Sequence, residues 1–139
     1  MPGSVLLDAG PLVAFLRSEE ENHDWAAQQF KRFPRFTTCE AVLAEACARL
    51  NYYGEEQNKV IELVRTGAVV VNFDLNHSAD RVSQLLKKYS DQPMDLADAC
   101  LVSMTEKTSN CLVVTLDHED FSIYRRQDRH VIPFISPKS

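Results

Sequence analysis

The sequence has no long hydrophobic run and no paired cysteines. No apolar stretch approaches the length of a membrane span, and the N-terminal MPGSVLLDAG has neither the basic start nor the cleavage site of a signal peptide. The four cysteines, Cys39, Cys47, Cys100 and Cys111, form no C-x-x-C pair. Three of them lie in apolar contexts, so we expect reduced, buried thiols. These absences predict a cytoplasmic protein with no membrane attachment and no disulfide framework.

The chain also has no excess of positive charge. Fifteen Lys and Arg residues against twenty Asp and Glu residues give a net charge of −5. This balance argues against a protein that coats nucleic acid through bulk charge. It still allows one that handles nucleic acid through metal ions and a local basic patch. No His-x-x-His pair and no glycine-rich phosphate loop is present.

The sequence does contain apolar runs that alternate with segments of helical periodicity. Its 139 residues, 45% of them hydrophobic, are enough for a real core, and no repeat or linker divides them. We therefore expect one domain over residues 1–139. Strands are expected at residues 4–8, 68–73, 111–117 and 131–135. Helices are expected from Pro11, around 26–33, over 39–54 with Thr38 as a possible cap, around 60–67, 79–89 and 95–104, with a short helical turn at 119–126.

The expected strands show no alternation of polar and apolar residues, and helices separate most of them. Both features are typical of a parallel sheet that is covered on its two faces. The sequence therefore predicts an α/β fold with right-handed crossovers.

Two of these strands end in aspartate. Asp8 ends VLLD, and Asp117 ends LVVTLD. Ligand sites in open α/β sheets lie outside the carboxyl ends of the strands, so two aspartates at one edge favour a site. Each could equally be a simple turn residue before a helix, and Asp120 competes with Asp117 as the cap of the short turn.

Two helices contribute further acids. Glu45 lies in a helix of small apolar residues, where the plain alternative is an exposed pair with Arg49. Asp98 shares a helix face with Leu101 and Val102, although its early position also suits the helix dipole. We expect function at Asp98, whereas Asp95 fits a cap and a site equally well.

Four or five carboxylates from two strand ends and two helices would repel one another unless a hard cation lay between them. Ligation by oxygen alone points to Mg²⁺ or Mn²⁺, because zinc would recruit His or Cys. The matching chemistry is metal-assisted hydrolysis of phosphodiesters.

Four segments, in this order, resemble the acidic motifs of PIN-domain nucleases. They are LLDAGPLVAFL at 6–16, AVLAEACARL at 41–50, MDLADACLVSM at 94–104 and LVVTLDHEDF at 112–121. The family's four acids fall on Asp8, Glu45, Asp98 and Asp117. Thr115 matches a residue that often supports the site. Asp95 and Asp120 match positions that are often polar or acidic, so they are candidates for an assisting role.

This resemblance implies a PIN-like three-layer sandwich, with a small central parallel sheet and helices on both faces. It also implies Mg²⁺- or Mn²⁺-dependent endonucleolytic cleavage of RNA and frequent homodimers. Many short members resemble VapC-type toxins, which a cognate antitoxin holds in check. In this reading Asp8 and Asp98 bind the principal ion, Glu45 binds it through water or orients the attacking water, and Asp117 binds a second ion.

Two other interpretations remain. One is a catalytically inert PIN-like domain that binds RNA or a protein partner. The other is a receiver-like Mg²⁺-binding signalling domain, although Ala9 and Gly10 stand where a receiver carries a second acid. Arg125, Arg126 and Arg129 form the densest basic cluster and are either RNA contacts or a solvated surface. Arg17 is a further candidate for a phosphate contact.

Overall fold

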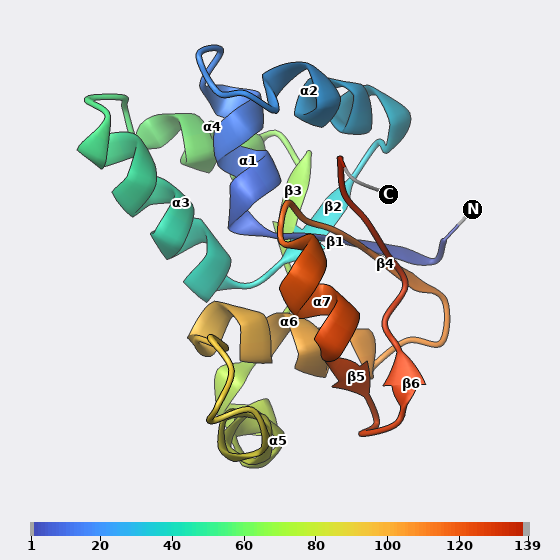
Figure 1. The fold of residues 1–139 in the computed structure, drawn as a ribbon. Helices are drawn as coiled ribbons and strands as arrows, with labels where there is room; N and C mark the ends of the chain where they lie inside the picture. Colours follow the sequence, from blue (N-terminus) through green and yellow to red (C-terminus); the bar gives the residue numbers. More distant parts are fainter. Residues whose placement is uncertain (1, 138–139) are drawn as a thin grey trace.

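A computed structural model describes residues 2–137 and contains a five-stranded sheet in which all neighbouring strands are parallel (Figure 1). The strand order is β3-β2-β1-β4-β7. The strands are β1 (Ser4–Leu7), β2 (Phe36–Thr38), β3 (Val69–Val71), β4 (Cys111–Val114) and β7 (Phe134–Ile135). The predicted α/β fold with a parallel sheet is therefore confirmed.

Helices cover both faces of this sheet. In the view of Figure 1, α1, α2 and α4 lie above the sheet and α5 and α6 lie below it. The helices are α1 (Ala9–Leu16), α2 (His23–Arg32), α3 (Glu40–Tyr52), α4 (Asn58–Arg65), α5 (Leu75–Lys88), α6 (Leu96–Thr105) and α7 (His118–Ile123). The central strands are buried on both sides, with Leu7, Val113 and Val114 at 0% exposure, which explains why their sequences do not alternate.

Two strands are not expected from the sequence. β5 (Arg125–Arg126) lies at the end of the helical turn predicted at 119–126, because α7 already ends at Ile123. β2 has only three residues, and the sequence offers its Thr38 as a possible cap of the next helix. Instead, the Thr38 hydroxyl donates to the carbonyl of Leu7 at 2.7 Å, and Cys39 occupies the cap position of α3. A three-residue strand is too short to show a period, so its pairing with β1 and β3 decides its conformation.

The predicted strand at 131–135 is divided between two sheets. His130–Val131 forms β6, which pairs antiparallel with β5 (Arg125–Arg126), and Phe134–Ile135 forms β7. Gln127 and Asp128, at φ of 47° and 65°, make the turn between β5 and β6. Pro133 separates the two halves, because it has no N–H to continue a ladder.

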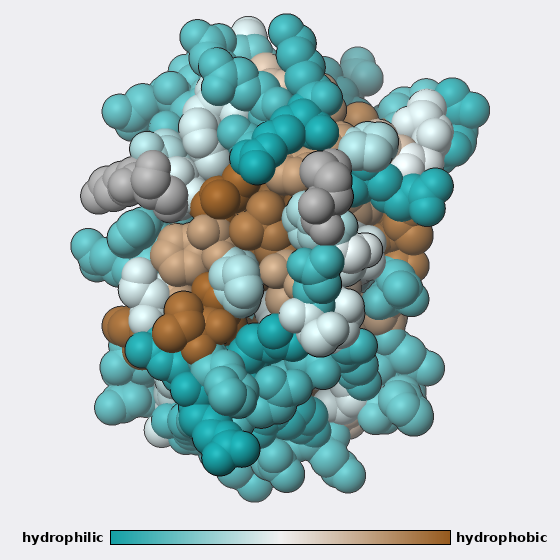
Figure 2. All heavy atoms as spheres, turned by 90° about the vertical axis from the view of Figure 1, so that its right-hand side faces the viewer, coloured by the Kyte–Doolittle hydropathy of each residue, from teal (hydrophilic) through white to brown (hydrophobic). Residues whose placement is uncertain are grey.

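The remaining sequence predictions concern the thiols and membrane spans. All four cysteines are free, as expected; Cys39, Cys100 and Cys111 are buried and Cys47 is partly exposed. Among the described residues, no helix combines the length and apolar character needed to cross a bilayer. Apolar side chains gather at the centre of the face in Figure 2, which lies away from α3.

Candidate metal centre

The pairing of β1 with β4 brings the first acid and its support together. Leu7 is in register with Val114, so Asp8 and Thr115 follow at the same sheet edge. The Thr115 hydroxyl donates to Asp8 Oδ2 at 2.7 Å, and the backbone N–H of Ala9 donates to Asp8 Oδ1 at 2.8 Å. The carboxylate of Asp8, at 8% exposure, is therefore held in one orientation.

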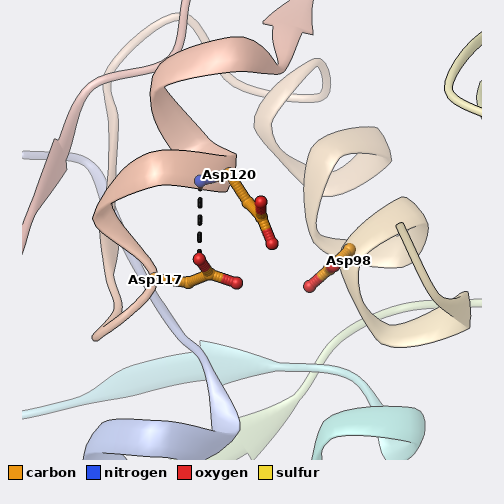
Figure 3. Close-up of side chains that lie close together, drawn as sticks. All are labelled: Asp98, Asp117 and Asp120. Carbon is orange, nitrogen blue, oxygen red and sulfur yellow. Dashed lines mark hydrogen bonds between the residues drawn. The ribbon is translucent and has the colours of Figure 1, made fainter. Parts of the chain in front are cut away.

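Thr115 also connects this carboxylate to the second strand end. Its hydroxyl oxygen accepts a hydrogen bond from the backbone N–H of Asp117 at 2.9 Å. Asp117 caps α7 and accepts from the N–H of Asp120 at 3.4 Å (Figure 3). Asp117, and not its competitor Asp120, is thus the cap of the short helix. Capping occupies one carboxylate oxygen and leaves the other free to face the site.

Asp98 is positioned by two neighbours. Asp95 caps α6, as one of its alternatives predicted, and its side chain accepts from the N–H of Asp98 at 2.9 Å. The hydroxyl of Tyr124, a residue with 0% exposure, donates to Asp98 Oδ2 at 3.0 Å. Sequence reasoning missed Tyr124, because a buried tyrosine after an apolar helix turn is indistinguishable from an ordinary core residue.

All six acids considered from the sequence line one cavity of about 470 Å³: Asp8, Glu45, Asp95, Asp98, Asp117 and Asp120. One carboxylate oxygen from each of Asp98, Asp117 and Asp120 lies within 4.8 Å of the others. Figure 3 shows these three side chains pointing toward a common space from α6 and from the start of α7. Asp120, expected only to assist, is therefore one of the three acids whose oxygens converge.

Crowding of these acids changes their titration. Burial, together with Asp8 and Asp95, raises the pKa of Asp98 to about 8. Burial also raises the pKa of Asp8, against the opposing effect of its hydrogen bonds from Thr115 and Ala9. The pKa of Asp120 rises to about 6 through burial and its contact with Asp117. These carboxyl groups therefore keep their protons to a higher pH than ordinary carboxyl groups do, as expected where few positive charges lie nearby.

Glu45 contributes from α3 and is only partly covered. Burial, then Asp8 and Asp95, raise its pKa. Its Oε2 lies 3.9 Å from Arg49 Nη1, with both side chains about 40% exposed, so the pairing proposed as the plain alternative exists but is loose. Arg49 is the one cationic side chain among the described residues that line the cavity.

The basic cluster near the C-terminus does not face this cavity. The Arg125 guanidinium donates to the carbonyls of Ser122, Ile123 and Tyr124. The Arg126 guanidinium donates to the carbonyls of Thr105, Thr108 and Ser109. These two arginines bind carbonyl groups at the end of α7 and at and after the end of α6, and they are partly exposed.

The donor set fits a hard divalent cation. The converging group contains carboxylate oxygens only, with no His or Cys among the described residues that compose it. Such donors suit Mg²⁺ or Mn²⁺, and a cation would offset the burial and the mutual repulsion that raise the pKa values of Asp8 and Asp98.

Comparisons with known proteins complete this description. The sequence model of the PIN domain family matches residues 5–127. The structure is similar to the crystal structure of VapC20, a sarcin–ricin loop-cleaving toxin of Mycobacterium tuberculosis, with a TM-score of 0.72. That match covers 79% of this chain and 87% of the other, and the sequences are 16% identical, so the likeness concerns the fold. A comparison with curated protein sequences gave no match.

Proposed function

Because the chain belongs to the PIN domain family, we propose that it is a divalent-metal-dependent endoribonuclease, which hydrolyses phosphodiester bonds in RNA. The observation that carries this proposal is the cavity in which six acidic side chains meet. A purely structural role gives no reason to gather these acids, because their negative charges repel one another.

Asp8 and Asp98 would hold the principal ion, with Asp117 and Asp120 completing the oxygen donors or holding a second ion. A bound Mg²⁺ or Mn²⁺ would polarise the scissile phosphate and make water a better nucleophile. Thr115 fixes the orientation of Asp8 and the backbone of Asp117. Tyr124 fixes the orientation of Asp98.

Glu45 and Arg49 stand at the α3 side of the cavity and differ in role. Glu45 is half-exposed and has a raised pKa, which suits a group that orients the attacking water or accepts its proton. Arg49 lies one turn further along α3 and would contact a phosphate of the substrate. The loose ion pair between them leaves both side chains free for these contacts.

The biological setting follows from the same family. We infer a VapC-type toxin that acts in the cytoplasm as a homodimer and is inhibited by a cognate antitoxin. Charge complementarity requires such an antitoxin to present basic side chains to the acidic cavity. A catalytically inert PIN-like domain is the outcome that the following experiment would reveal.

The test is cleavage of a structured RNA by the purified protein in Mg²⁺, in Mn²⁺ and in EDTA. We expect cleavage with either ion and none in EDTA. Asp98→Asn should lower the rate by about a hundredfold or more, because a neutral amide binds a divalent ion more weakly than a carboxylate does. Asp80→Asn, a change at an exposed acid of α5 outside the cavity, should cut like the wild type. Full metal-dependent activity of Asp98→Asn would contradict the assignment.

A further inference from the structure

The outer face of α3 carries two exposed tyrosines, Tyr52 and Tyr53, which we call the tyrosine pair. Tyr52 is 82% exposed and Tyr53 is 47% exposed. Their rings lie 5.2 Å apart, nearly edge to face, with an interplanar angle of 81°. Aromatic rings usually contribute to folding through burial, and a ring as exposed as that of Tyr52 contributes little. Folding alone therefore does not explain the exposed ring of Tyr52, whereas contact with a binding partner would.

The tyrosine pair is continuous with the acidic cavity along one helix face. Glu45 and Arg49 line the cavity, and Tyr52 follows them at the spacing i, i+4, i+7. At 1.5 Å per residue, Tyr52 lies about 10 Å beyond Glu45 along the axis of α3. A strand of nucleic acid with one phosphate in the cavity would bring a neighbouring nucleotide to Tyr52.

The ring of Tyr53 is held in place from the other side. The guanidinium of Arg17, at the end of α1, lies 3.9 Å from the centroid of the Tyr53 ring. Arg17 is itself fixed by an ion pair with Glu20 at 2.7 Å. Tyr53 thus packs between the guanidinium of Arg17 and the more exposed ring of Tyr52.

We propose that Tyr52 is a stacking platform for an unpaired base next to the cleaved phosphodiester, so that its ring contributes to the affinity for RNA that extends beyond the cavity. This inference rests on the proposed ribonuclease function. Bases of any identity stack on aromatic rings, whereas paired bases in a helix are already stacked and unavailable. Removal of the Tyr52 ring should therefore weaken the binding of single-stranded RNA that reaches beyond the cavity. A protein partner is less suited, because Asn51, Gly54 and Glu55 next to the rings keep the apolar patch narrow.

The test compares the cleavage of a short and a long substrate in the presence of Mn²⁺. Bis(p-nitrophenyl) phosphate fills only the cavity, whereas a single-stranded RNA dodecamer extends to α3. Tyr52→Ala should lower kcat/KM for the dodecamer about tenfold, mostly through KM, with little effect on the small ester. Tyr52→Phe keeps the ring and should restore the dodecamer rate. Val131→Ala, a change at an exposed residue of β6 on the other side of the molecule, is the matched control (Figure 1).

A binding measurement separates failure of the platform from failure of the nuclease. Fluorescence anisotropy of a labelled dodecamer is compared for Asp98→Asn and for the double variant Asp98→Asn/Tyr52→Ala, so that no cleavage intervenes. About tenfold weaker binding of the double variant would support the platform, whether or not the wild type cleaves RNA. Absence of cleavage of both substrates by the wild type would refute the proposed nuclease activity and leave the platform standing. Equal binding and equal dodecamer cleavage would overturn the platform. So would conversion of a dimer to a monomer by Tyr52→Ala, because Tyr52 would then belong to a subunit interface.

Discussion

At the scale of single residues, the hydrogen bond from Tyr124 to Asp98 is the contact most directly tied to the proposed chemistry. Tyr124→Phe removes the hydroxyl and leaves the buried ring in place. Partners that orient metal ligands typically account for a 10- to 100-fold effect on affinity, so we expect Mn²⁺ to bind about tenfold more weakly. Isothermal titration calorimetry with Mn²⁺ measures this directly and needs no RNA.

The matched control is Tyr89→Phe. The Tyr89 hydroxyl accepts from the backbone N–H of Arg125 at 2.9 Å, and its ring packs edge-on against Tyr124. Loss of that hydroxyl should lower stability by about 1–3 kcal/mol, because a backbone N–H loses its acceptor, and should leave Mn²⁺ affinity unchanged. Equal losses of affinity in both variants would mean that Tyr124 acts only through general packing.

At the scale of elements, the contact of α1 with the connection after β4 determines where Asp117 lies. A Cβ at Gly10 would come within 2.9 Å of Leu116 Cγ, closer than carbon atoms approach. Gly10→Ala should therefore displace Leu116 and the neighbouring Asp117, with an RNA-cleavage rate about tenfold lower and a loss of about 1–3 kcal/mol in unfolding free energy. Cleavage assays and thermal denaturation give the two numbers.

Two further variants check the cause. The double variant Gly10→Ala/Leu116→Ala makes room for the new methyl group and should recover part of the activity. Gly67→Ala introduces strain at φ +86° with open space around it, so it should reduce stability without affecting cleavage. If Gly67→Ala and Gly10→Ala lost activity equally, the argument from the Leu116 contact would fail.

Individual strands and helices also show which parts of the structure can be predicted from the sequence. The continuous apolar runs of β1 and β4 identify buried strands from the sequence, and the order of strands and helices then places Asp8 and Asp117 at one edge. β2 and the β5–β6 hairpin are held by pairing partners distant in sequence, so their two or three residues carry no signal of their own. The contact of Tyr124 with Asp98 and the approach of Asp120 to Asp98 depend on how α7 packs, which local patterns do not encode.

At the scale of the whole molecule, the acidic cavity couples stability to pH. The pKa of Asp98 rises from 3.8 to about 8 on folding, so between these values the folded state binds more protons than the unfolded chain. The free energy of unfolding of the metal-free protein should therefore fall as pH rises from about 4 to 8. The pKa of Asp120, raised to about 6, acts in the same direction over the lower part of this range.

Thermal denaturation in EDTA at pH 5 and pH 8 tests this expectation. The wild-type Tm should drop by several degrees more than that of Asp98→Asn, which has no carboxylate to ionise at this position. Addition of Mn²⁺ at pH 8 should restore the wild-type Tm, because the ion binds only the folded state. A steeper fall for Asp98→Asn than for the wild type would refute the assigned titration.

The acids of the cavity come from positions 8, 45, 95, 98, 117 and 120, and Tyr124 follows them. A nascent chain on the ribosome therefore holds Asp8 and Glu45 long before it holds their counterparts, and β4 has yet to pair with β1. The acidic cavity can therefore form only after residue 124 has been synthesised and β4 has paired with β1.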